Sequence, residues 1–495
     1  MSEISLAGLP EVFVSSSALS KAAGAAVARG ELRKLGSRLY TRNLTEDPER
    51  LVRRSWYFLI GGYYPDALIA DRTALENKPA VDGSVFLISD GTREVELPGL
   101  IFRPRKGPPA IDSDRAFPGG AHLSSIPRAY LENMTPSRGR GGRTPRTLGR
   151  DEIEQRLDAL ARQQGEAALN KLRDDARAIA GQLGLERQFE ELSALIGTLL
   201  GTRDVKTQSA VGAARTAGKP FDPDRLELFE RLFSGLREFV PTDRSTSGRS
   251  AEATTNLAFY EAYFSNFIEG TEFSVDEAKE IVFEGIIPAE RPEDAHDVLG
   301  TFRIVSDVVE MSRVPTSGQE FVELLQARHG RIMEGRPDKK PGEFKTQRNQ
   351  AGNTVFVIPD LVRGTLEKGF EFLNALGEPF QRAVFMMFLV SEVHPFADGN
   401  GRVGRAMMNA ELVTGGQERI IIPTAYRTDY LGALKAISQT GHTDPVVRML
   451  DVAQRYTHSI EWGSMASAHA LLEQTNAFAE GELAKLKLPT NSPGN

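Results

Sequence analysis

The sequence contains no cysteine among its 495 residues. A chain without thiols forms no disulfide and offers no thiolate to a metal ion, which excludes a disulfide-stabilised fold and a cysteine-ligated zinc site. The sequence also lacks a run of about 18 apolar residues, the length that a membrane-spanning helix needs. The first ten residues carry Glu3 and no basic stretch before an apolar core, so no secretory signal is predicted. We therefore expect a cytoplasmic protein with no membrane contact.

The sequence has no strong excess of charge. Its formal net charge is −7, with 40% hydrophobic and 26% charged residues, a balance typical of globular domains. The first third is the basic part, so any contact with nucleic acid must be local. The chain is too long for one hydrophobic core, and two or three domains are expected.

The most informative stretch of the sequence lies between residues 394 and 405, which read His-Pro-Phe-Ala-Asp-Gly-Asn-Gly-Arg-Val-Gly-Arg. Residues 380–393 and 403–413 on either side have apolar side chains at helical spacing. The stretch is therefore predicted to be a loop that ends one buried helix and begins the next. Taken separately, His-Pro-Phe and Gly-Asn-Gly are common turns, and arginines that begin a helix are usually solvated. Their combination in one ungapped run favours a functional site.

This combination suits a polyphosphate ligand. Glycines let backbone N–H groups approach a ligand closely, and a helix N-terminus adds free donors and partial positive charge. Arg402 and Arg405 lie three residues apart and share a face of the helix. Asp398 is a suitable ligand for Mg²⁺, and His394 can accept a proton from an attacking hydroxyl. The pattern predicts transfer of a nucleotide or phosphoryl group from a nucleoside triphosphate with Mg²⁺.

The same run resembles the signature of Fic proteins, His-x-Phe-x-Asp/Glu-Gly-Asn-Gly-Arg-x-x-Arg, at every fixed position, and the flanking sequence resembles them from about residue 255 to 465. Fic enzymes typically transfer AMP from ATP to a hydroxyl of a target protein. The resemblance implies that His394 is the general base, that Phe396 braces the loop and that Asp398 holds Mg²⁺. It implies phosphate-binding roles for Gly399, Asn400, Gly401, Arg402 and Arg405.

A second motif lies upstream, at residues 265–270, which read Ser-Asn-Phe-Ile-Glu-Gly. The pattern predicts the last turn of a helix closed by Gly270, which places Glu269 at the negative end of the helix dipole. A surface glutamate is one interpretation. Beside a Fic motif, the run resembles the inhibitory Ser/Thr-x-x-x-Glu-Gly/Asn motif of that family, which assigns Ser265, Glu269 and Gly270 to inhibition. The resemblance implies that Glu269 pairs with Arg405 and prevents productive binding of the outer phosphate.

Residues 345–358 predict a hairpin with its turn at 350–353. Fic proteins carry a hairpin flap here that aligns the target segment by strand addition, through backbone hydrogen bonds. The resemblance implies that Lys345, Thr346 and Gln347 belong to this flap, and a purely structural hairpin is the alternative. The scattered residues His296 and His329 are expected to be exposed or internally satisfied rather than ligands.

The first 60 residues predict a small basic αβ unit. An alanine-rich helix over 18–29 is followed by residues 32–42, which alternate like a hairpin around Gly36. A helix followed by a basic hairpin is the arrangement of a winged helix-turn-helix, and a solvated αβ unit is the alternative. In the winged helix, phosphate contacts would come from Lys21, Arg33, Lys34 and Arg38.

Residues 84–89 and 94–103 predict two strands joined by a hairpin turn at Asp90-Gly91. Residues 136–150 carry five arginines and no acid, and we expect either a solvated linker or a nucleic-acid contact. Residues 151–200 predict helices.

Part of this region is similar to the AbiEi-type antitoxins, which carry an N-terminal winged helix and act in type IV toxin–antitoxin systems, often as repressors. The resemblance is carried by three segments: Phe13–Asn43, Asp71–Leu75 and Ser124–Leu131. It implies a DNA-binding role for the first domain.

The expected fold is mainly helical with an α+β N-terminal part, in which a winged-helix-like, AbiEi-like module precedes an all-α Fic-fold domain with a β-hairpin flap. The expected segments are a winged-helix-like DNA-binding domain at 1–60, an AbiEi-like α+β and helical region at 61–200, a linker at 201–224, a Fic domain with an N-terminal inhibitory helix at 225–475 and a tail at 476–495.

The predicted function is that of a protein adenylyltransferase that moves AMP from ATP to a Ser, Thr or Tyr hydroxyl, uses Mg²⁺ and is inhibited by Glu269. One alternative is a DNA-binding antitoxin or repressor whose Fic half senses nucleotide. Another is a Fic enzyme that transfers a different nucleotide or removes AMP. The candidate partners are ATP, a target protein or this chain itself, DNA through the N-terminal module, and a second copy of the chain.

Overall fold

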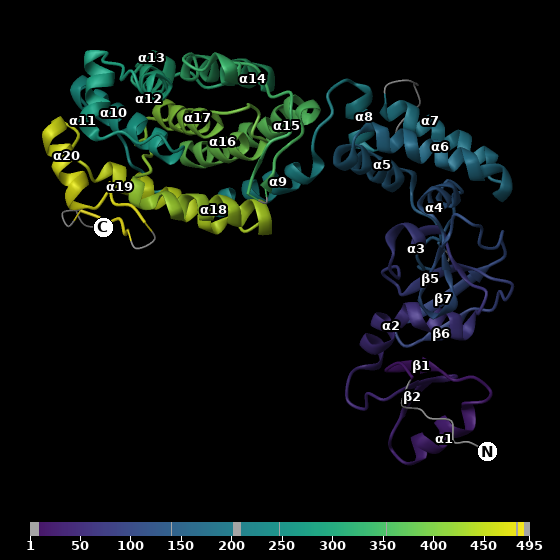
Figure 1. The fold of residues 1–495 in the computed structure, drawn as a ribbon. Coiled ribbons are helices and arrows are strands. Elements are labelled where there is room, and N and C mark those ends of the chain that lie inside the picture. The colour runs from purple at the N-terminus through teal and green to yellow at the C-terminus, as the bar shows by residue number, and fades with distance from the viewer. Residues whose placement is uncertain are drawn as a thin grey trace. The chain divides into compact units, whose positions relative to one another are not determined.

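The computed structural model describes residues 9–139, 141–200, 209–246, 248–352, 354–481 and 484–489. The chain divides into two compact units, Met1–Gly218 and Lys219–Asn495, which we call the N-terminal and C-terminal units (Figure 1). The division falls within the predicted linker at 201–224, of which residues 201–208 lie outside the described ranges. The same holds for 482, 483 and 490–495 of the predicted tail. Within the described ranges, no helix is long and apolar enough to cross a membrane.

The N-terminal unit begins with one helix and a three-stranded antiparallel sheet. β1 (Val12–Val14) pairs with β3 (Leu39–Thr41), which also pairs with β2 (Arg33–Gly36). α1 (Ser20–Ala28) packs its buried alanines against Phe13 and Tyr40. The predicted helix and hairpin are both present. Because described residues 9–47 hold only this one helix, the winged helix stays a prediction.

A six-stranded mixed sheet follows, with strand order β6-β7-β5-β4-β9-β8. Its strands are β4 (Leu68–Ile69), β5 (Ser84–Ile88), β6 (Val95–Leu97), β7 (Leu100–Arg105), β8 (Arg115–Ala116) and β9 (His122–Leu123). The predicted hairpin at Asp90-Gly91 is wrong, because β5 pairs with β7 in parallel and the hairpin joins β6 to β7. That turn is made at Pro98-Gly99, where Gly99 has a positive φ of 65°. The Asp90 N–H instead donates to the side chain of Asp66.

The remaining elements of the N-terminal unit are helical: α2 (Pro48–Tyr63), α3 (Asp71–Glu76), η1 (Pro118–Gly120), α4 (Ile126–Asn133), α5 (Arg150–Gln164), α6 (Glu166–Leu183), α7 (Glu186–Leu199) and α8 (Ala210–Thr216). The arginine-rich segment before α5 has no regular element among its described residues. Two of its arginines pair within the unit: Arg143 with Glu94 at 2.8 Å, and Arg146 with Asp71 at 2.8 Å.

The C-terminal unit is helical except for one small hairpin, β10 (Gln350–Ala351) with β11 (Thr354–Val355). Its helices are α9 (Pro223–Glu238), α10 (Ala251–Ile268), α11 (Val275–Lys279), η2 (Glu280–Glu284), α12 (Pro292–Val305), α13 (Val308–Met311), α14 (Gly318–Ile332), η3 (Pro337–Lys339), η4 (Pro359–Leu361), α15 (Val362–Asn374), α16 (Pro379–Val393), α17 (Asn400–Thr414), η5 (Thr424–Tyr426), α18 (Arg427–Thr440), α19 (Asp444–His458) and α20 (Met465–Gln474).

α16 and α17 run side by side through the middle of this unit (Figure 1). Every residue from 383 to 390 is buried, because α16 has apolar side chains on all its faces and packs against α9, α15 and α17. Its one charged residue in the first turns, Arg382, pairs with Glu411 of α17 at 2.7 Å. The loop at 394–399 therefore connects two helices whose positions are fixed by the core.

We expect Gly369→Ala to destabilise the C-terminal unit by roughly 1–3 kcal/mol. A Cβ at this position in α15 would lie 2.3 Å from Leu389 of α16 and 3.2 Å from Phe229 of α9, and this overlap outweighs the better helix propensity of alanine. Urea unfolding followed by tryptophan fluorescence measures it. The chain has two tryptophans, so Trp56→Phe leaves Trp462 to report on this unit.

Gly377→Ala is the matched control, because a Cβ there meets no atom within 4 Å. A Gly369→Ala protein as stable as the control would contradict the close packing of α15 on α16.

Candidate active site

His394 directly follows α16 and has a left-handed backbone with a φ of 51°. Its N–H still donates to the carbonyl of Val390, at 3.0 Å, so the chain turns sharply out of the helix at this residue. Nδ1 lies 3.2 Å from the carbonyl oxygen of Ser391. Because a carbonyl only accepts, Nδ1 carries the proton and Nε2 is free to act as a base.

The surroundings of His394 keep its imidazole neutral. Burial lowers its pKa to about 4; the hydrogen bond to Ser391 opposes this shift, and the nearby charge of Lys345 adds to it. The ring of Phe356, which follows β11, stacks on the imidazole with 3.8 Å between centroids. At neutral pH the side chain is therefore an unprotonated base.

The loop after His394 is braced from inside. Phe396 is fully buried, and its N–H donates to Asn400 Oδ1 at 2.8 Å while its carbonyl accepts from Asn400 Nδ2 at 3.0 Å. The Asn400 side chain thus closes the loop onto the start of α17. The ring of Phe396 stacks on His329 of α14 with 3.6 Å between centroids.

His329 of α14 holds the loop by a hydrogen bond to its backbone. It is 0% exposed, and its Nδ1 accepts the N–H of Gly342 at 2.9 Å. Nε2 therefore carries the proton and donates to the backbone carbonyl of Asp398 at 3.0 Å. The expectation of an internally satisfied histidine is met. Its contact with the motif was missed, because no local pattern connects two residues 69 positions apart.

Asp398 is the candidate metal ligand. Its side chain is 40% exposed, and Oδ1 accepts the N–H of Gly399 at 2.7 Å. No group of three or more histidines and acids among the described residues is placed to hold a metal ion. A partly exposed carboxylate fits Mg²⁺, which commonly takes one or two carboxylates and completes its shell with water and phosphate oxygens. Mg²⁺ at Asp398 would therefore be bound together with a nucleotide.

A pocket of about 370 Å³ adjoins the loop. His394, Gly401 and Arg405 line it, together with a face of α18. That face carries residues at helical spacing: Arg427, Tyr430, Leu431, Leu434, Lys435 and Ser438. A cavity lined by both apolar and polar side chains is typical of a small-ligand site.

The carboxylate of Glu269 also lines this pocket. It follows α10, and its Oε1 lies 2.7 Å from Arg405 Nη2. Arg405 further donates to the hydroxyl and carbonyl of Ser265, at 3.0 and 2.8 Å. A Cβ on Gly401 would lie 2.0 Å from Glu269 Oε1, so a side chain there would overlap the carboxylate. Glu269 therefore lies directly against the N-terminal turn of α17. Gly270, with a φ of 93°, ends the helix behind it.

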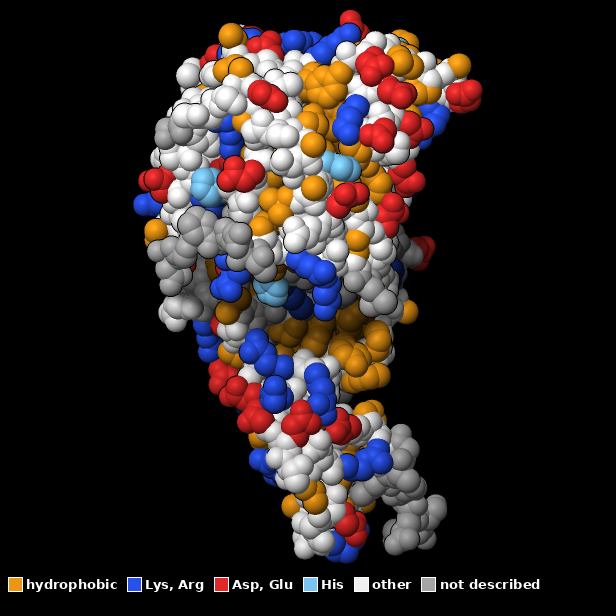
Figure 2. Space-filling model, turned by 90° about the vertical axis from the view of Figure 1, so that its left-hand side faces the viewer, with side chains coloured by type: hydrophobic (Ala, Val, Ile, Leu, Met, Phe, Trp, Pro, Cys, Tyr) orange, Lys and Arg blue, Asp and Glu red, His pale blue; other side chains and the backbone are white. Residues whose placement is uncertain are grey.

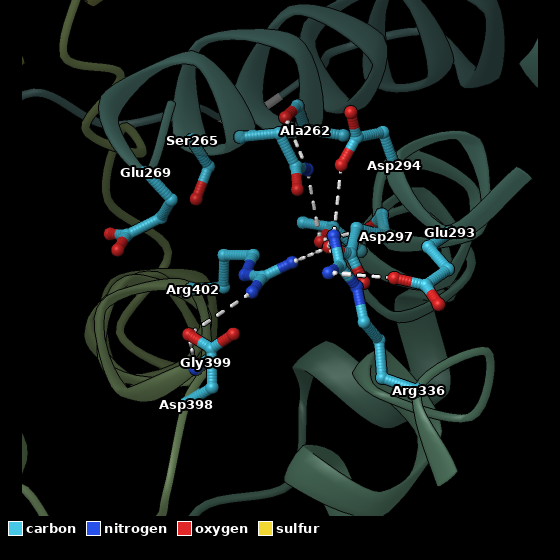
Figure 3. A network of polar contacts seen from close by, with 12 residues as sticks. Ala262, Ser265, Glu269, Glu293, Asp294, Asp297, Arg336, Asp398, Gly399 and Arg402 are labelled. Atoms are coloured by element: carbon cyan, nitrogen blue, oxygen red, sulfur yellow. Dashed lines mark hydrogen bonds and ion pairs between the residues drawn. The ribbon is translucent and has the colours of Figure 1, made fainter. Parts of the chain in front are cut away.

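The two motif arginines have different partners. Whereas Arg405 lines the pocket, Arg402 is buried against α12, with Nη1 2.5 Å from Asp297 Oδ2 and Nη2 3.6 Å from Asp398 Oδ1 (Figure 3). Sequence reasoning placed both on one face toward the phosphates and did not consider Asp297.

Of the predicted flap residues, Thr346 and Gln347 are exposed and Lys345 is buried. The Lys345 N–H donates to the carbonyl of Pro395 at 2.8 Å, and its Nζ lies 2.6 Å from Asn349 Oδ1. Burial lowers the pKa of Lys345 to about 7, and the charge of Arg225 adds to this shift. Lys345 thus holds the motif loop. A hairpin is present, but Gln350 and Ala351, which were predicted to lie in its turn, form β10. Residue 353 of the predicted turn lies outside the described residues.

Of the four predicted DNA contacts, Lys21 and Lys34 are exposed. Arg33 donates to the carbonyl of Glu46 at 3.1 Å, and Arg38 donates to backbone carbonyls of Ser15 and Gly62 at 2.9 Å. On the face of the molecule in Figure 2, Lys and Arg side chains lie among Asp and Glu side chains. Arg33 and Arg38, two of the four predicted DNA contacts, thus donate hydrogen bonds to backbone carbonyls of the N-terminal unit itself.

Comparison with known proteins identifies one domain of the chain. Residues 321–412 match the Fic/DOC family, so the chain contains a Fic/DOC domain that includes the His394 loop and the start of α17.

Protein adenylyltransferase fic-1 of Caenorhabditis briggsae is 26% identical over 267 residues, 51% of this chain and 51% of the relative. Protein adenylyltransferase Fic of Drosophila persimilis is 24% identical over 272 residues, 53% of each chain. The chain thus spans about half the length of the curated relatives it matches. A solved structure of Fic-1 from C. elegans is 18% identical and covers 65% of this chain and 92% of that chain, with a TM-score of 0.35.

We expect acid to destabilise the C-terminal unit through His329. Burial lowers its pKa from 6.5 to about 4, so below pH 6.5 the unfolded chain binds a proton that the folded chain excludes. Between pH 6.5 and about pH 5, His329 therefore lowers the free energy of unfolding by roughly 2 kcal/mol. His329→Gln should remove this part of the pH dependence. Urea unfolding of the Trp56→Phe protein at the two pH values measures the difference.

His296 is exposed, and His296→Gln should leave the pH dependence as it is in the wild type. The idea is abandoned if His329→Gln behaves in the same way as that control.

Proposed function

We propose that this chain is a protein adenylyltransferase, which moves AMP from ATP to a Ser, Thr or Tyr hydroxyl of a target protein, and that Glu269 inhibits it. The observation that carries the proposal is the shared pocket of His394, Gly401 and Arg405. A base, a helix N-terminus and a guanidinium around one cavity are the groups that attack on a phosphate requires. The names of the curated relatives, at 24–26% identity, support the same activity.

In the proposed reaction, the hydroxyl oxygen attacks the α-phosphorus of ATP while its proton passes to Nε2 of His394. A bond forms between this oxygen and the α-phosphorus. The bond from the α-phosphorus to the oxygen that bridges to the β-phosphate breaks, and pyrophosphate leaves with that electron pair. The backbone N–H groups at the start of α17 stabilise the negative charge on the phosphates. Mg²⁺ held by Asp398 would neutralise further phosphate charge.

Inhibition follows from the position of the Glu269 carboxylate. It neutralises Arg405 and places a negative charge against Gly401, in the space that a phosphate would need. A like charge at about 4 Å costs roughly 4 kcal/mol at an effective dielectric constant of 20. ATP therefore binds with its outer phosphates displaced, or Glu269 moves away.

We expect Glu269→Gly to raise AMP transfer by about tenfold or more, the effect of removing about 1.4 kcal/mol of repulsion. Intact mass after incubation with Mg-ATP detects self-modification as the gain of one AMP. Glu272→Gly is the matched control, because Glu272 is exposed and close in sequence. Equal turnover of wild type and Glu269→Gly over a titration of Mg-ATP would refute the inhibitory role. No gain in any form would call for an external target protein.

We expect His394→Ala in the Glu269→Gly protein to lower the transfer rate by roughly 10²-fold or more, because the general base is lost. Binding of ATP, measured by calorimetry, should remain within about twofold, since the imidazole is not a phosphate ligand in this proposal. His296→Ala, on the exposed side chain, controls for the loss of a histidine. A transfer rate unaffected by His394→Ala would rule out the proposed base.

A further inference from the structure

Arg402 lies in a chain of alternating charges, none of whose residues lines the pocket (Figure 3). Its guanidinium lies between the carboxylates of Asp297, at 2.5 Å, and Asp398, at 3.6 Å. Asp297 Oδ2 also accepts two hydrogen bonds from Arg336, at 2.7 and 3.0 Å. Arg336 in turn pairs with Asp294 at 2.9 Å. The order of charges is Arg336, Asp297, Arg402, Asp398.

The middle of this chain is buried. Asp297 is 1% exposed and Arg402 is 3% exposed, where α12 packs against the first turns of α17. Arg402 Nε and Nη1 and Asp297 Oδ1 have no hydrogen-bond partner among the described residues. The ion pair with Asp297, rather than full hydrogen bonding of its own, therefore fixes the guanidinium. Breaking a buried pair leaves an uncompensated charge, which is strongly unfavourable.

This arrangement keeps Arg402 from serving the pocket. Arg405 lines the pocket and contacts Glu269 there, whereas Arg402 is held from behind by α12. To reach a phosphate in the pocket, Arg402 would have to leave Asp297, which would then share its charge with Arg336 alone. On the side of the loop, the charged group near the Arg402 guanidinium is the carboxylate of Asp398.

Asp297 also sets how closely Arg402 approaches Asp398. At 3.6 Å the second ion pair is loose, and the Asp398 side chain stays 40% exposed. If Asp297 lost its charge, the buried guanidinium would be drawn onto Asp398, the remaining carboxylate beside it. A carboxylate engaged by a direct guanidinium contact is a weaker ligand for a cation.

We propose that Asp297 is a positioning residue that holds Arg402 back from Asp398 and so keeps this carboxylate available to a divalent cation. Arg402 then orients the metal ligand and does not bind the phosphates. The identity of the cation as nucleotide-bound Mg²⁺ rests on the proposed function.

The test measures cation binding. Mn²⁺ takes the same oxygen ligands as Mg²⁺, and electron paramagnetic resonance counts the free ion. The Glu269→Gly protein is saturated with a non-hydrolysable ATP analogue, so Glu269 does not interfere. We expect Asp297→Asn to weaken Mn²⁺ binding by about tenfold or more. Asp294→Asn is the matched control on the same helix, because it removes a partner of Arg336 without touching Arg402, and should stay within about twofold.

Arg336→Gln gives an outcome that mere structural damage would not. Without Arg336, Asp297 belongs to Arg402 alone and holds it at least as firmly, so Mn²⁺ affinity should be retained. If Arg336→Gln weakens Mn²⁺ binding as much as Asp297→Asn, both changes act through general loosening and the proposal fails. Trp462 fluorescence during unfolding identifies a variant that does not fold.

Binding of ATP in EDTA separates the two arginines. In the same Glu269→Gly background, Arg405→Gln should weaken ATP binding by about tenfold or more, whereas Arg402→Gln should change it by less than about twofold. Equal losses would show that Arg402 binds phosphate and would overturn the proposal. These measurements do not depend on AMP transfer. A protein that shows the expected pattern but transfers no AMP retains the positioning role while the proposed function fails.

Discussion

The carboxylate of Glu269 lies against the N-terminal turn of α17, and the arrangement of the site depends on this contact. A helix N-terminus attracts anions through its free N–H groups and its dipole, and Arg405 adds a full positive charge. The carboxylate of Glu269 pairs with this guanidinium at 2.7 Å and occupies the space beside Gly401. Two segments 136 positions apart in the chain are thereby joined at the start of α17.

The other residues of the motif divide between chemistry and support. His394 is left as a neutral base because its Nδ1 donates to Ser391 and burial lowers its pKa to about 4. The loop around it is held by side chains that do not reach the pocket: Asn400 closes it, and His329 supports it from α14. A loop held by packing and hydrogen bonds on both sides needs little reorganisation when a ligand binds beside it.

Local patterns in the sequence predicted much of this site. The loop between two buried helices, the end of α10 at Glu269 and its pairing with Arg405 all follow from spacing, helix-end signals and the resemblance to known motifs. The contacts of Asp297 and His329 with the motif were not predicted, because they join segments far apart in the chain and have no local signal. In the N-terminal unit, two sequences that favour a hairpin turn, Asp90-Gly91 and Pro98-Gly99, lie close together in the chain. Pro98-Gly99 makes the hairpin, since Asp90 is engaged by Asp66.

Competition between the Glu269 carboxylate and the phosphates of a nucleotide is tested most directly by calorimetry of adenosine, ADP and ATP binding in EDTA, with wild type and Glu269→Gly. If the two compete, wild type and Glu269→Gly should bind adenosine with affinities that agree within about twofold. The affinity of Glu269→Gly should exceed that of wild type by a factor that grows with the number of phosphates, to about tenfold or more for ATP. Equal affinity of both proteins for ATP, or a gain of the same size for adenosine, would contradict this competition.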